Sequence, residues 1–187
     1  MDNHTFPAED ADRLEDAAMR YRHCSAEELL WALDPTEADS VVDLGSGTGF
    51  YTDDVAPHVE TVYAVDLQAA MQDRYREKGV PENVELVTSG ADDLPFAADS
   101  MDAAFATTTY HELPVAAFDE LARVVRPGGR VVVVDWTGSG DGEYGPPVDE
   151  RHDAAHAAAT VEAVGLDVEF SATRAETFLL TARLPDE

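Results

Sequence analysis

The chain has 187 residues, a length that suits one domain with one sizeable hydrophobic core. Its 12 basic residues stand against 39 acidic ones, which gives a formal net charge of −27 at pH 7. Lysines and arginines form no cluster, so we expect no nucleic-acid partner, because dense phosphate contacts need such clusters. The sequence has no apolar run long enough for a membrane span and its acidic N-terminus does not resemble a signal peptide, which predicts a cytoplasmic protein.

The acidity is typical of halophilic proteins. Lys78 is the single lysine, and the carboxylates are spread along the whole chain. Acidic surfaces of this kind keep proteins soluble in concentrated salt. The alternatives are an acidic partner-binding protein or a disordered acidic tail, and the dispersed acids and globular apolar content favour halophilic origin over both.

The N-terminal part is expected to be helical. We predict one domain over residues 1–187, with a helical cap over 1–38 and an α/β core over 39–187. Helices are predicted at 8–22 and 25–33. Ser25 and Glu28 have the spacing of a capping box at the start of the second helix, and Asp34 with the following proline should end it.

Strands and helices alternate through the core. We predict strands at 40–44, 61–66, 83–88, 102–107 and 130–135, and helices near 49–57, 68–78 and 114–125. The sequence RPGG at 126–129 should end the last of these helices and turn into the next strand. Such alternation predicts a parallel sheet with right-handed crossovers, which is a doubly wound α/β fold.

The C-terminal third is predicted to close the sheet. Residues 137–148 are rich in glycine and proline and should form a loop. A helix is expected near 150–164. It is followed by two predicted strands, at 166–174 and 176–183, which are expected to pair as a hairpin.

A glycine-rich turn follows the first predicted strand. Gly45, Gly47 and Gly49 allow a ligand to approach the backbone closely, and the next helix points its free N–H groups at that ligand. Asp66 ends the second strand, where an acid accepts hydrogen bonds from ribose hydroxyls, although it could equally cap the helix that follows. The pattern predicts a site for a nucleoside-bearing ligand. Its G-x-G-x-G spacing differs from the dinucleotide G-x-G-x-x-G, so S-adenosylmethionine is the leading ligand and an NAD(P) dehydrogenase is disfavoured.

The chain resembles a class I S-adenosylmethionine-dependent methyltransferase of the small UbiE-like type. The segments that carry the resemblance are VVDLGSGTGFYT at 41–52, VYAVDL at 62–67, LPF at 94–96, YHEL at 110–113, LARVVRPGGRVVVVDW at 121–136 and GPP at 145–147. The resemblance implies a Rossmann-like seven-stranded sheet of order 3-2-1-4-5-7-6 with the seventh strand antiparallel. It also implies methyl transfer to a small-molecule acceptor, with isoprenoid quinone precursors as one candidate class.

The resemblance implies a set of cofactor-binding residues along the carboxyl edge of the sheet. They are Asp43, Gly45, Ser46, Gly47, Gly49, Tyr51, Asp66, Leu67, Asp92 and Thr107. Asp43 is expected to hold the ammonium group or to satisfy the turn's own N–H groups. Tyr51 is expected either near the sulfonium or in simple helix packing. The acid that usually contacts the adenine amino group falls at Gly90 here, so Asp92, Ser89 or backbone groups are expected to replace it. Leu67 and Leu94 are candidates to flank the adenine ring, and both could equally belong to the core.

The acceptor is expected beside the segments that follow the fourth and fifth strands. His111 is the candidate general base, with the alternative that His111 and Glu112 only shape the pocket. Tyr110, Asp135 and Arg151 are the candidate substrate-binding residues, with a surface-helix position as the alternative for Arg151.

Other functional classes are weaker. His152 and His156 have a spacing that suits metal binding on a helix, but partner ligands are not evident, so we expect no metal site. A non-catalytic S-adenosylmethionine-binding regulatory or structural protein is the alternative to an enzyme, because the usual adenine-binding acid is missing. The acceptor and the oligomeric state stay open at this level.

Overall fold

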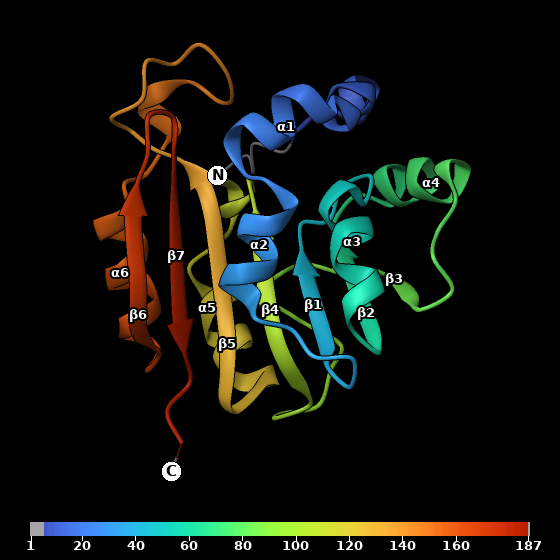
Figure 1. Ribbon diagram of the computed structural model, residues 1–187, viewed down its shortest axis with the longest axis vertical. Helices are drawn as coiled ribbons and strands as arrows, with labels where there is room; N and C mark the ends of the chain where they lie inside the picture. The colour runs from blue at the N-terminus through green and yellow to red at the C-terminus, as the bar shows by residue number, and fades with distance from the viewer. Residues whose placement is uncertain (1–5, 187) are drawn as a thin grey trace.

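Short runs of β-branched and other apolar residues form the central sheet. The computed structural model describes residues 6–186, so the first five residues of the predicted N-terminal cap lie outside the described part. Its sheet has seven strands in the order β3-β2-β1-β4-β5-β7-β6, and β7 is antiparallel to both of its neighbours (Figure 1). This confirms the expected doubly wound fold and strand order. The strands are β1 (Ser40–Leu44), β2 (Thr61–Asp66), β3 (Val84–Thr88), β4 (Met101–Thr107), β5 (Val125–Trp136), β6 (Asp167–Thr173) and β7 (Thr177–Arg183).

Helices cover both faces of the sheet (Figure 1). The α-helices are α1 (Ala17–His23), α2 (Ala26–Leu33), α3 (Phe50–Val55), α4 (Ala69–Lys78), α5 (Ala116–Val124) and α6 (Ala154–Ala163). Short 3₁₀ helices are η1 (Ala8–Glu15), η2 (Ala56–His58), η3 (Tyr110–Glu112) and η4 (Val148–Glu150). Within residues 6–186, none of the helices combines the length and the apolar character that crossing a membrane requires.

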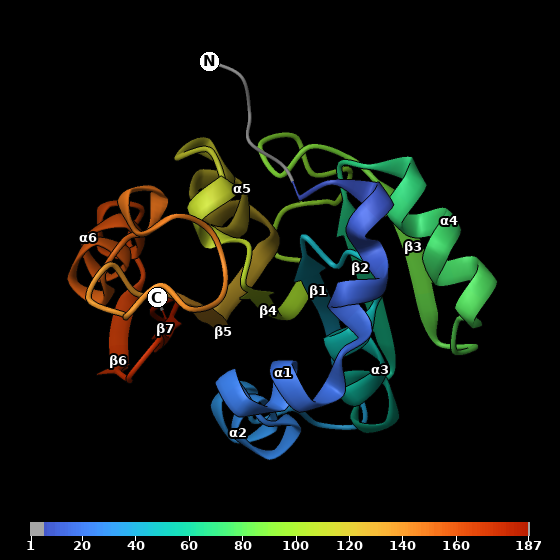
Figure 2. The same cartoon turned by 90° about the horizontal axis from the view of Figure 1, so that it is seen from above.

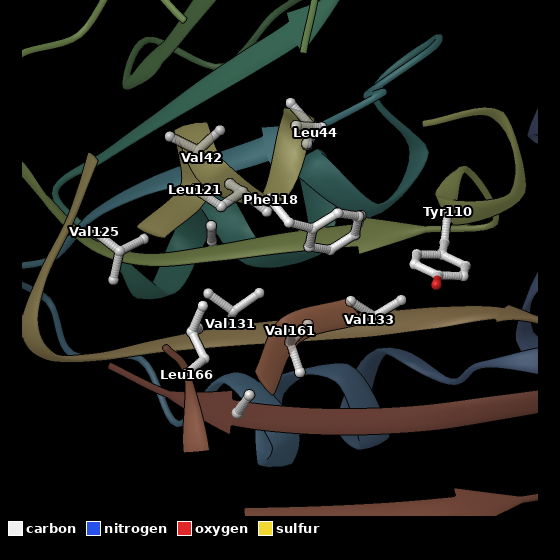
Figure 3. Close-up of a cluster of buried hydrophobic side chains, with 14 of the residues drawn as sticks. Val42, Leu44, Tyr110, Phe118, Leu121, Val125, Val131, Val133, Val161 and Leu166 are labelled. Atoms are coloured by element: carbon white, nitrogen blue, oxygen red, sulfur yellow. The ribbon is translucent and has the colours of Figure 1, made fainter. Parts of the chain in front are cut away.

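Alternating side chains of β5 supply both halves of the core. Val131 and Val133 belong to the cluster that packs α5 and α6 on one face, where Phe118 and Val161 lie close to them (Figure 3). Val132 belongs to the second cluster, which includes residues of α2, α3 and α4. This is the two-residue period of a strand buried on both faces, which a parallel sheet requires.

The N-terminal prediction was wrong in one respect. The helix expected over 8–22 is interrupted at Asp16, which has a non-helical ψ of 90°. The Asp16 side chain accepts a hydrogen bond from Met19 N at 3.1 Å and so caps α1 as a new helix. The physical reason is that a short polar side chain competes with the helical backbone for N–H groups. The predicted cap of α2 is confirmed, because Ser25 Oγ accepts from Glu28 N at 3.1 Å.

Two further boundaries differ from the prediction. The sequence RPGG at 126–129 lies inside β5, which begins directly after α5 at Val125, and the pairing with β4 is irregular beside it. The last helix, α6, begins only at Ala154, where Asp153 accepts from His156 N at 2.7 Å. Arg151 therefore precedes the helix and does not lie on its surface.

The parallel strands direct their carboxyl ends to one edge of the sheet. Seen from above, η1 and α1 lie over this edge on one side, and the loop between β5 and η4 lies over it on another (Figure 2). Side chains that follow β1, β2, β4 and β5 therefore meet beneath these coverings, which is where open α/β sheets bind ligands.

Candidate functional site

A cavity of about 750 Å³ lies at the carboxyl edge of the sheet. Segments that are far apart in the chain form its wall. They are parts of residues 6–20, the glycine turn with its flanks at 44–50, residues 65–71 after β2, residues 89–92 after β3, residues 107–114 after β4, and Trp136 with residues 144–147 after β5. The cavity lies above the neighbouring strands β1 and β4, where the strand order of the sheet reverses.

The glycine turn forms one end of this cavity. Gly45 and Gly47 line it and have φ values of 74° and 56°, which favour glycine. A Cβ atom on Gly45 would lie 2.2 Å from the Thr109 side chain, so the turn has no room for a larger residue there. Ser46 also lines the cavity, and its buried Oγ has no hydrogen-bond partner among the described residues. The turn therefore offers close backbone approach and one uncommitted hydroxyl.

Gly49 serves the packing beneath the turn. It does not line the cavity, and its φ is 78°. A Cβ atom at this position would lie 2.1 Å from the Tyr75 ring of α4. The third glycine of the motif thus lets α4 pack against the turn, whereas the first two face the ligand space.

Asp66 links the glycine turn to the segment after β2. Its Oδ2 accepts from Gly47 N at 2.8 Å, and its Oδ1 accepts from Gln68 N at 2.7 Å. Burial raises the pKa of Asp66, although these two backbone hydrogen bonds oppose the shift. The side chain lines the cavity, and each carboxylate oxygen can accept a further hydrogen bond from a ligand hydroxyl.

Asp43 lies beneath the turn, outside the cavity wall. Its Oδ2 accepts from the Thr52 hydroxyl at 2.5 Å, and its Oδ1 has no partner among the described residues. Burial raises the pKa of this carboxyl group to about 7. Its observed partner is therefore a side chain of α3. The sequence had suggested N–H groups of the turn or a ligand ammonium as partners.

Tyr51 also points away from the cavity. Its hydroxyl donates to the carbonyls of Arg20 and Cys24, each at 3.0 Å, and the Arg20 guanidinium lies 4.5 Å from its ring centroid. The structure thus places Tyr51 as the support of Arg20, away from the position near a sulfonium that the sequence suggested.

Arg20 is a cavity residue that the sequence did not reveal. It lies on α1, its Nη1 donates to Thr108 Oγ1 at 2.9 Å, and its buried Nε has no partner among the described residues. Burial lowers the pKa of this guanidinium, but a guanidinium stays charged at neutral pH. A buried cation with a free donor beside the glycine turn is suited to a carboxylate. No spacing signals this role, because α1 and the turn meet only in the folded chain.

The segment after β3 provides the opposite end of the nucleoside space. Ser89, Gly90, Ala91 and Asp92 all line the cavity, and Asp92 is exposed. A Cβ atom on Gly90 would lie 2.7 Å from Asp92 Oδ1, so the glycine leaves room for this carboxylate. Leu67 lines the cavity, and 54% of its surface is exposed. Its side chain is therefore available to cover an apolar ring.

Leu94 does not share this position with Leu67. It is buried in the hydrophobic core next to α5, and its backbone N–H donates to Glu120 Oε2 at 2.8 Å. Of the two positions expected for Leu94, beside the adenine or in the core, the structure shows the core.

The end of β4 is tied to the glycine turn. Thr107 lines the cavity, and its carbonyl accepts from the hydroxyls of Thr108 at 2.7 Å and Thr109 at 3.2 Å. The Thr109 hydroxyl also donates to the carbonyl oxygen of Gly45 at 3.3 Å. These contacts fix the segment that leads into η3.

His111 and Asp135 form a buried pair at the other half of the cavity. His111 lines the cavity, and its Nδ1 lies 2.9 Å from Asp135 Oδ2. The same carboxylate oxygen accepts from His111 N at 2.7 Å. A carboxylate only accepts, so Nδ1 carries the hydrogen, and Nε2, which lies 3.6 Å from Glu112 Oε1, is left as the titrating atom. Burial lowers the pKa of His111, but the hydrogen bond and the charge of Asp135 outweigh it, and the pKa is raised overall.

The three predicted substrate-binding residues all lie one layer behind the cavity wall. Asp135 is fully buried under His111. The Tyr110 hydroxyl lies 2.7 Å from His156 Nδ1 and 3.0 Å from Thr160 Oγ1, both of α6. Arg151 is buried and bonds to backbone carbonyls of the loop after β5. None of the three lines the cavity, which corrects the expectation of direct contact.

The neighbours of these residues face the cavity in their place. Strand side chains alternate, so the burial of Asp135 on one side of β5 turns the next residue, Trp136, to the other. The acceptor half is lined by His111, Glu112, Leu113, Pro114, Trp136, Tyr144, Gly145, Pro146 and Pro147. Its wall is mostly apolar and aromatic, and its polar side chains are His111, Glu112 and Tyr144.

The histidine pair at the start of α6 is not part of a metal cluster in the described structure. The rings of His152 and His156 stack with centroids 4.1 Å apart. Within residues 6–186, no group of three or more His, Cys, Asp or Glu side chains is arranged to hold a metal ion.

Comparison with known proteins is consistent with this geometry. Residues 42–133 match a family described as a methyltransferase domain. The chain is 35% identical over 108 residues to a demethylmenaquinone methyltransferase from Corynebacterium kroppenstedtii, covering 56% of this chain and 45% of that protein. It is 38% identical over 109 residues to an uncharacterized methyltransferase from Mycobacterium bovis, covering 58% of this chain and 44% of that protein. The chain thus spans less than half the length of these curated relatives.

A solved structure matches over nearly the whole chain. It is a SAM-dependent methyltransferase from Aquifex aeolicus, with a TM-score of 0.87 and 27% sequence identity, covering 96% of this chain and 100% of that one. The glycine turn, Asp66, the Ser46 hydroxyl and Arg20 fit such a cofactor, because they offer acceptors for its hydroxyl and ammonium groups and a cation for its carboxylate. Residues 42–133 thus match a methyltransferase domain, and the chain as a whole shares the fold of a SAM-dependent methyltransferase.

Proposed function

We propose that the chain transfers a methyl group to a small, neutral acceptor that carries a hydroxylated aromatic or similar apolar body. The observation that supports this most is the His111–Asp135 pair, which opens on the same cavity as the glycine turn. The acceptor half of that cavity has aromatic walls, and Glu112 beside His111 disfavours an anionic acceptor. Four similar proteins are named demethylmenaquinone methyltransferases, which makes quinol-like rings the first acceptors to test.

The cofactor half would be held by residues already placed around it. Asp66 would accept from the ribose hydroxyls, and Leu67 with residues 89–92 would enclose the adenine. Arg20 would pair with the carboxylate of the methionine portion, and Ser46 with the turn backbone would hold its remaining polar groups. When bound, S-adenosylmethionine supplies an electrophilic methyl group on a positively charged sulfur.

His111 would act as the general base. Asp135 holds Nδ1, so the neutral ring presents the lone pair of Nε2 to the acceptor hydroxyl. His111 Nε2 would accept the proton of the acceptor hydroxyl while that oxygen or the ring carbon takes the methyl group and the methyl–sulfur bond breaks, and Asp135 would stabilise the imidazolium that forms. The apolar wall around this point excludes water and aligns the acceptor, which supplies the positional part of the catalysis.

The pH dependence of the reaction tests this role. Because the pKa of His111 is raised, kcat/KM should increase with pH through an ionisation above about 6.5. Asp135→Asn should move that ionisation to lower pH and reduce kcat, since the amide neither raises the pKa nor stabilises the imidazolium. An unchanged profile in this variant would contradict the base.

The deciding experiment is a mass-shift assay in high salt with quinols and matched aromatic carboxylates as acceptors. Methylated quinol is expected from the wild type, and His111→Gln should lower turnover by about 10²–10⁴-fold while affinity for S-adenosylhomocysteine stays the same. Calorimetry on the same samples separates the alternatives. Tight S-adenosylhomocysteine binding with no product from any acceptor would favour the non-catalytic binding protein instead.

A further inference from the structure

The loop between β5 and η4 is rich in glycine yet tightly held. It contains Gly138, Gly140, Gly142 and Gly145, a composition that favours mobility in an exposed segment. Its last part, residues 144–147, nevertheless forms the acceptor-side wall of the cavity. Something other than its own sequence therefore fixes its position.

A buried arginine provides the attachment. The Arg151 side chain has 0% exposed surface, and its Nε donates to Pro146 O at 2.9 Å. Its Nη2 donates to Tyr144 O, and its Nη1 lies 3.3 Å from Glu176 Oε2. One guanidinium thus joins two carbonyls of the loop to the start of β7, which suits the rigid, forked donor set of arginine.

Glu176 holds the other end of the loop. Its Oε1 accepts from Asp141 N at 2.9 Å, while its Oε2 is paired with Arg151. Its backbone carbonyl also accepts from Thr137 N at 2.9 Å. The two charged residues consequently bind the loop at its beginning, in its middle and near its end.

We call Arg151 and Glu176 the clamp. The loop that they hold lies directly on Trp136. A Cβ atom on Gly145 would lie 2.5 Å from the indole, so the backbone rests against that ring. The Arg151 guanidinium lies 5.4 Å from the same ring centroid. Tyr144 is in turn held from α1, where the His23 ring is 5.6 Å from its ring. Trp136 and Tyr144 both line the cavity, so the loop that Arg151 and Glu176 hold is part of the cavity wall.

We propose that Arg151 and Glu176 are positioning residues that hold residues 141–147 against Trp136 and so preform the acceptor-side wall. This inference rests on the proposed function, because it assigns that half of the cavity to the acceptor. Neither residue touches the cavity, so both act through Trp136 and Tyr144. The arrangement reduces the ordering cost that an acceptor would otherwise meet on binding.

Fluorescence quenching tests the clamp without any acceptor. The chain has two tryptophans, Trp31 and Trp136, and only Trp136 lies near the clamp. A Trp31→Phe background therefore makes Trp136 the sole emitter, and its 5% exposure predicts weak quenching by acrylamide. Arg151→Lys should raise the quenching constant by about twofold or more, and Arg151→Ala should raise it further, because a released loop opens locally.

Matched variants keep this test decisive. Arg174→Lys alters an ion pair with Glu28 outside the loop and should leave quenching of Trp136 unchanged. Removal of one partner of a buried pair is strongly destabilising, so Glu176→Gln, which keeps the size of the side chain, serves as the second variant. It should raise quenching as Arg151→Lys does, with S-adenosylhomocysteine affinity within about twofold of wild type, because the clamp and the cofactor half share no residue.

The outcomes separate this inference from the proposed function. Unchanged quenching in Arg151→Lys and Glu176→Gln would overturn the clamp. A loss of S-adenosylhomocysteine affinity as large as the gain in quenching would also overturn it, since the two residues would then support the whole cavity. A failure to find any methylated product leaves these readouts unaffected and bears on the proposed function alone.

Discussion

Replacement of Asp66 by alanine should weaken both the fold and cofactor binding. The carboxylate joins two segments, because it accepts from Gly47 N at 2.8 Å in the glycine turn and from Gln68 N at 2.7 Å after β2. It also lines the cavity. Asp66→Ala therefore removes two internal hydrogen bonds and a partner for the ligand at once.

The size of each effect follows from the number of bonds. A hydrogen bond to a charged group contributes about 1.5–3 kcal/mol, and Gln68 N can find water in the variant, so the free energy of unfolding should fall by about 2–4 kcal/mol. Loss of the ribose contact should lower S-adenosylhomocysteine affinity by about 10- to 150-fold, which corresponds to about 1.5–3 kcal/mol. The free energy of unfolding and the affinity of Asp66→Asn should lie between those of wild type and Asp66→Ala. The amide oxygen can still accept from one N–H group, whereas the amide nitrogen faces the other.

Denaturant melts and calorimetry in high salt measure the two effects separately. Asp92→Ala is the matched control, because this exposed acid lines the cavity without tying two backbone segments together. It should change affinity while leaving the unfolding free energy within about 0.5 kcal/mol of wild type. Wild-type stability together with wild-type affinity in Asp66→Ala would refute the reasoning.

Three further predictions concern stability. The pKa of Asp43 is raised to about 7 by burial, so its proton stabilises the fold at low pH and this contribution is lost as pH rises from about 4 to 7. Asp43→Asn should gain on wild type by about 1.4 kcal/mol per pH unit across that window in denaturant melts, and a difference that is constant with pH would contradict the shift. Gly49→Ala should cost more than about 2 kcal/mol, because it combines a positive φ with a clash against Tyr75, and a wild-type melt would contradict that packing. The net charge of −27 predicts a melting temperature that rises with added KCl, and a flat salt series would argue against halophilic adaptation.

The sheet was predictable because its signals are local. Buried strands such as β1 are short, mostly apolar runs, and each ends in a turn or a helix start that the sequence marks. Predicted element boundaries were wrong where a local hydrogen bond or turn competes with the periodic hydrophobic pattern. Asp16 interrupts a helix that hydrophobic spacing alone would continue, and Val125 starts a strand before the glycines that suggested a turn.

The cofactor half of the site followed from the sequence more closely than the acceptor half. Gly45, Gly47 and Asp66 line the cavity because backbone geometry at a strand end places them there. Arg20 was missed because its role depends on how α1 folds back over the sheet, which no local spacing encodes. The sequence left two positions open for Tyr51 because its ring could turn toward either side of α3, and in the structure its hydroxyl bonds to carbonyls at the end of α1.

The two halves of the cavity are supported by different physics. Backbone conformation and the short bonds of Asp66 shape the cofactor half, whereas buried charge pairs stand behind the acceptor half, with Asp135 behind His111 and Glu176 beside Arg151. Buried pairs are screened much less than exposed ones, so salt should act mainly through the acidic surface and not through these contacts. Protonation is different, because the raised pKa of His111 lets the imidazolium persist at higher pH than a free histidine would. Protonation of His111 should therefore impair acceptor use, because this ring lies in the acceptor half of the cavity.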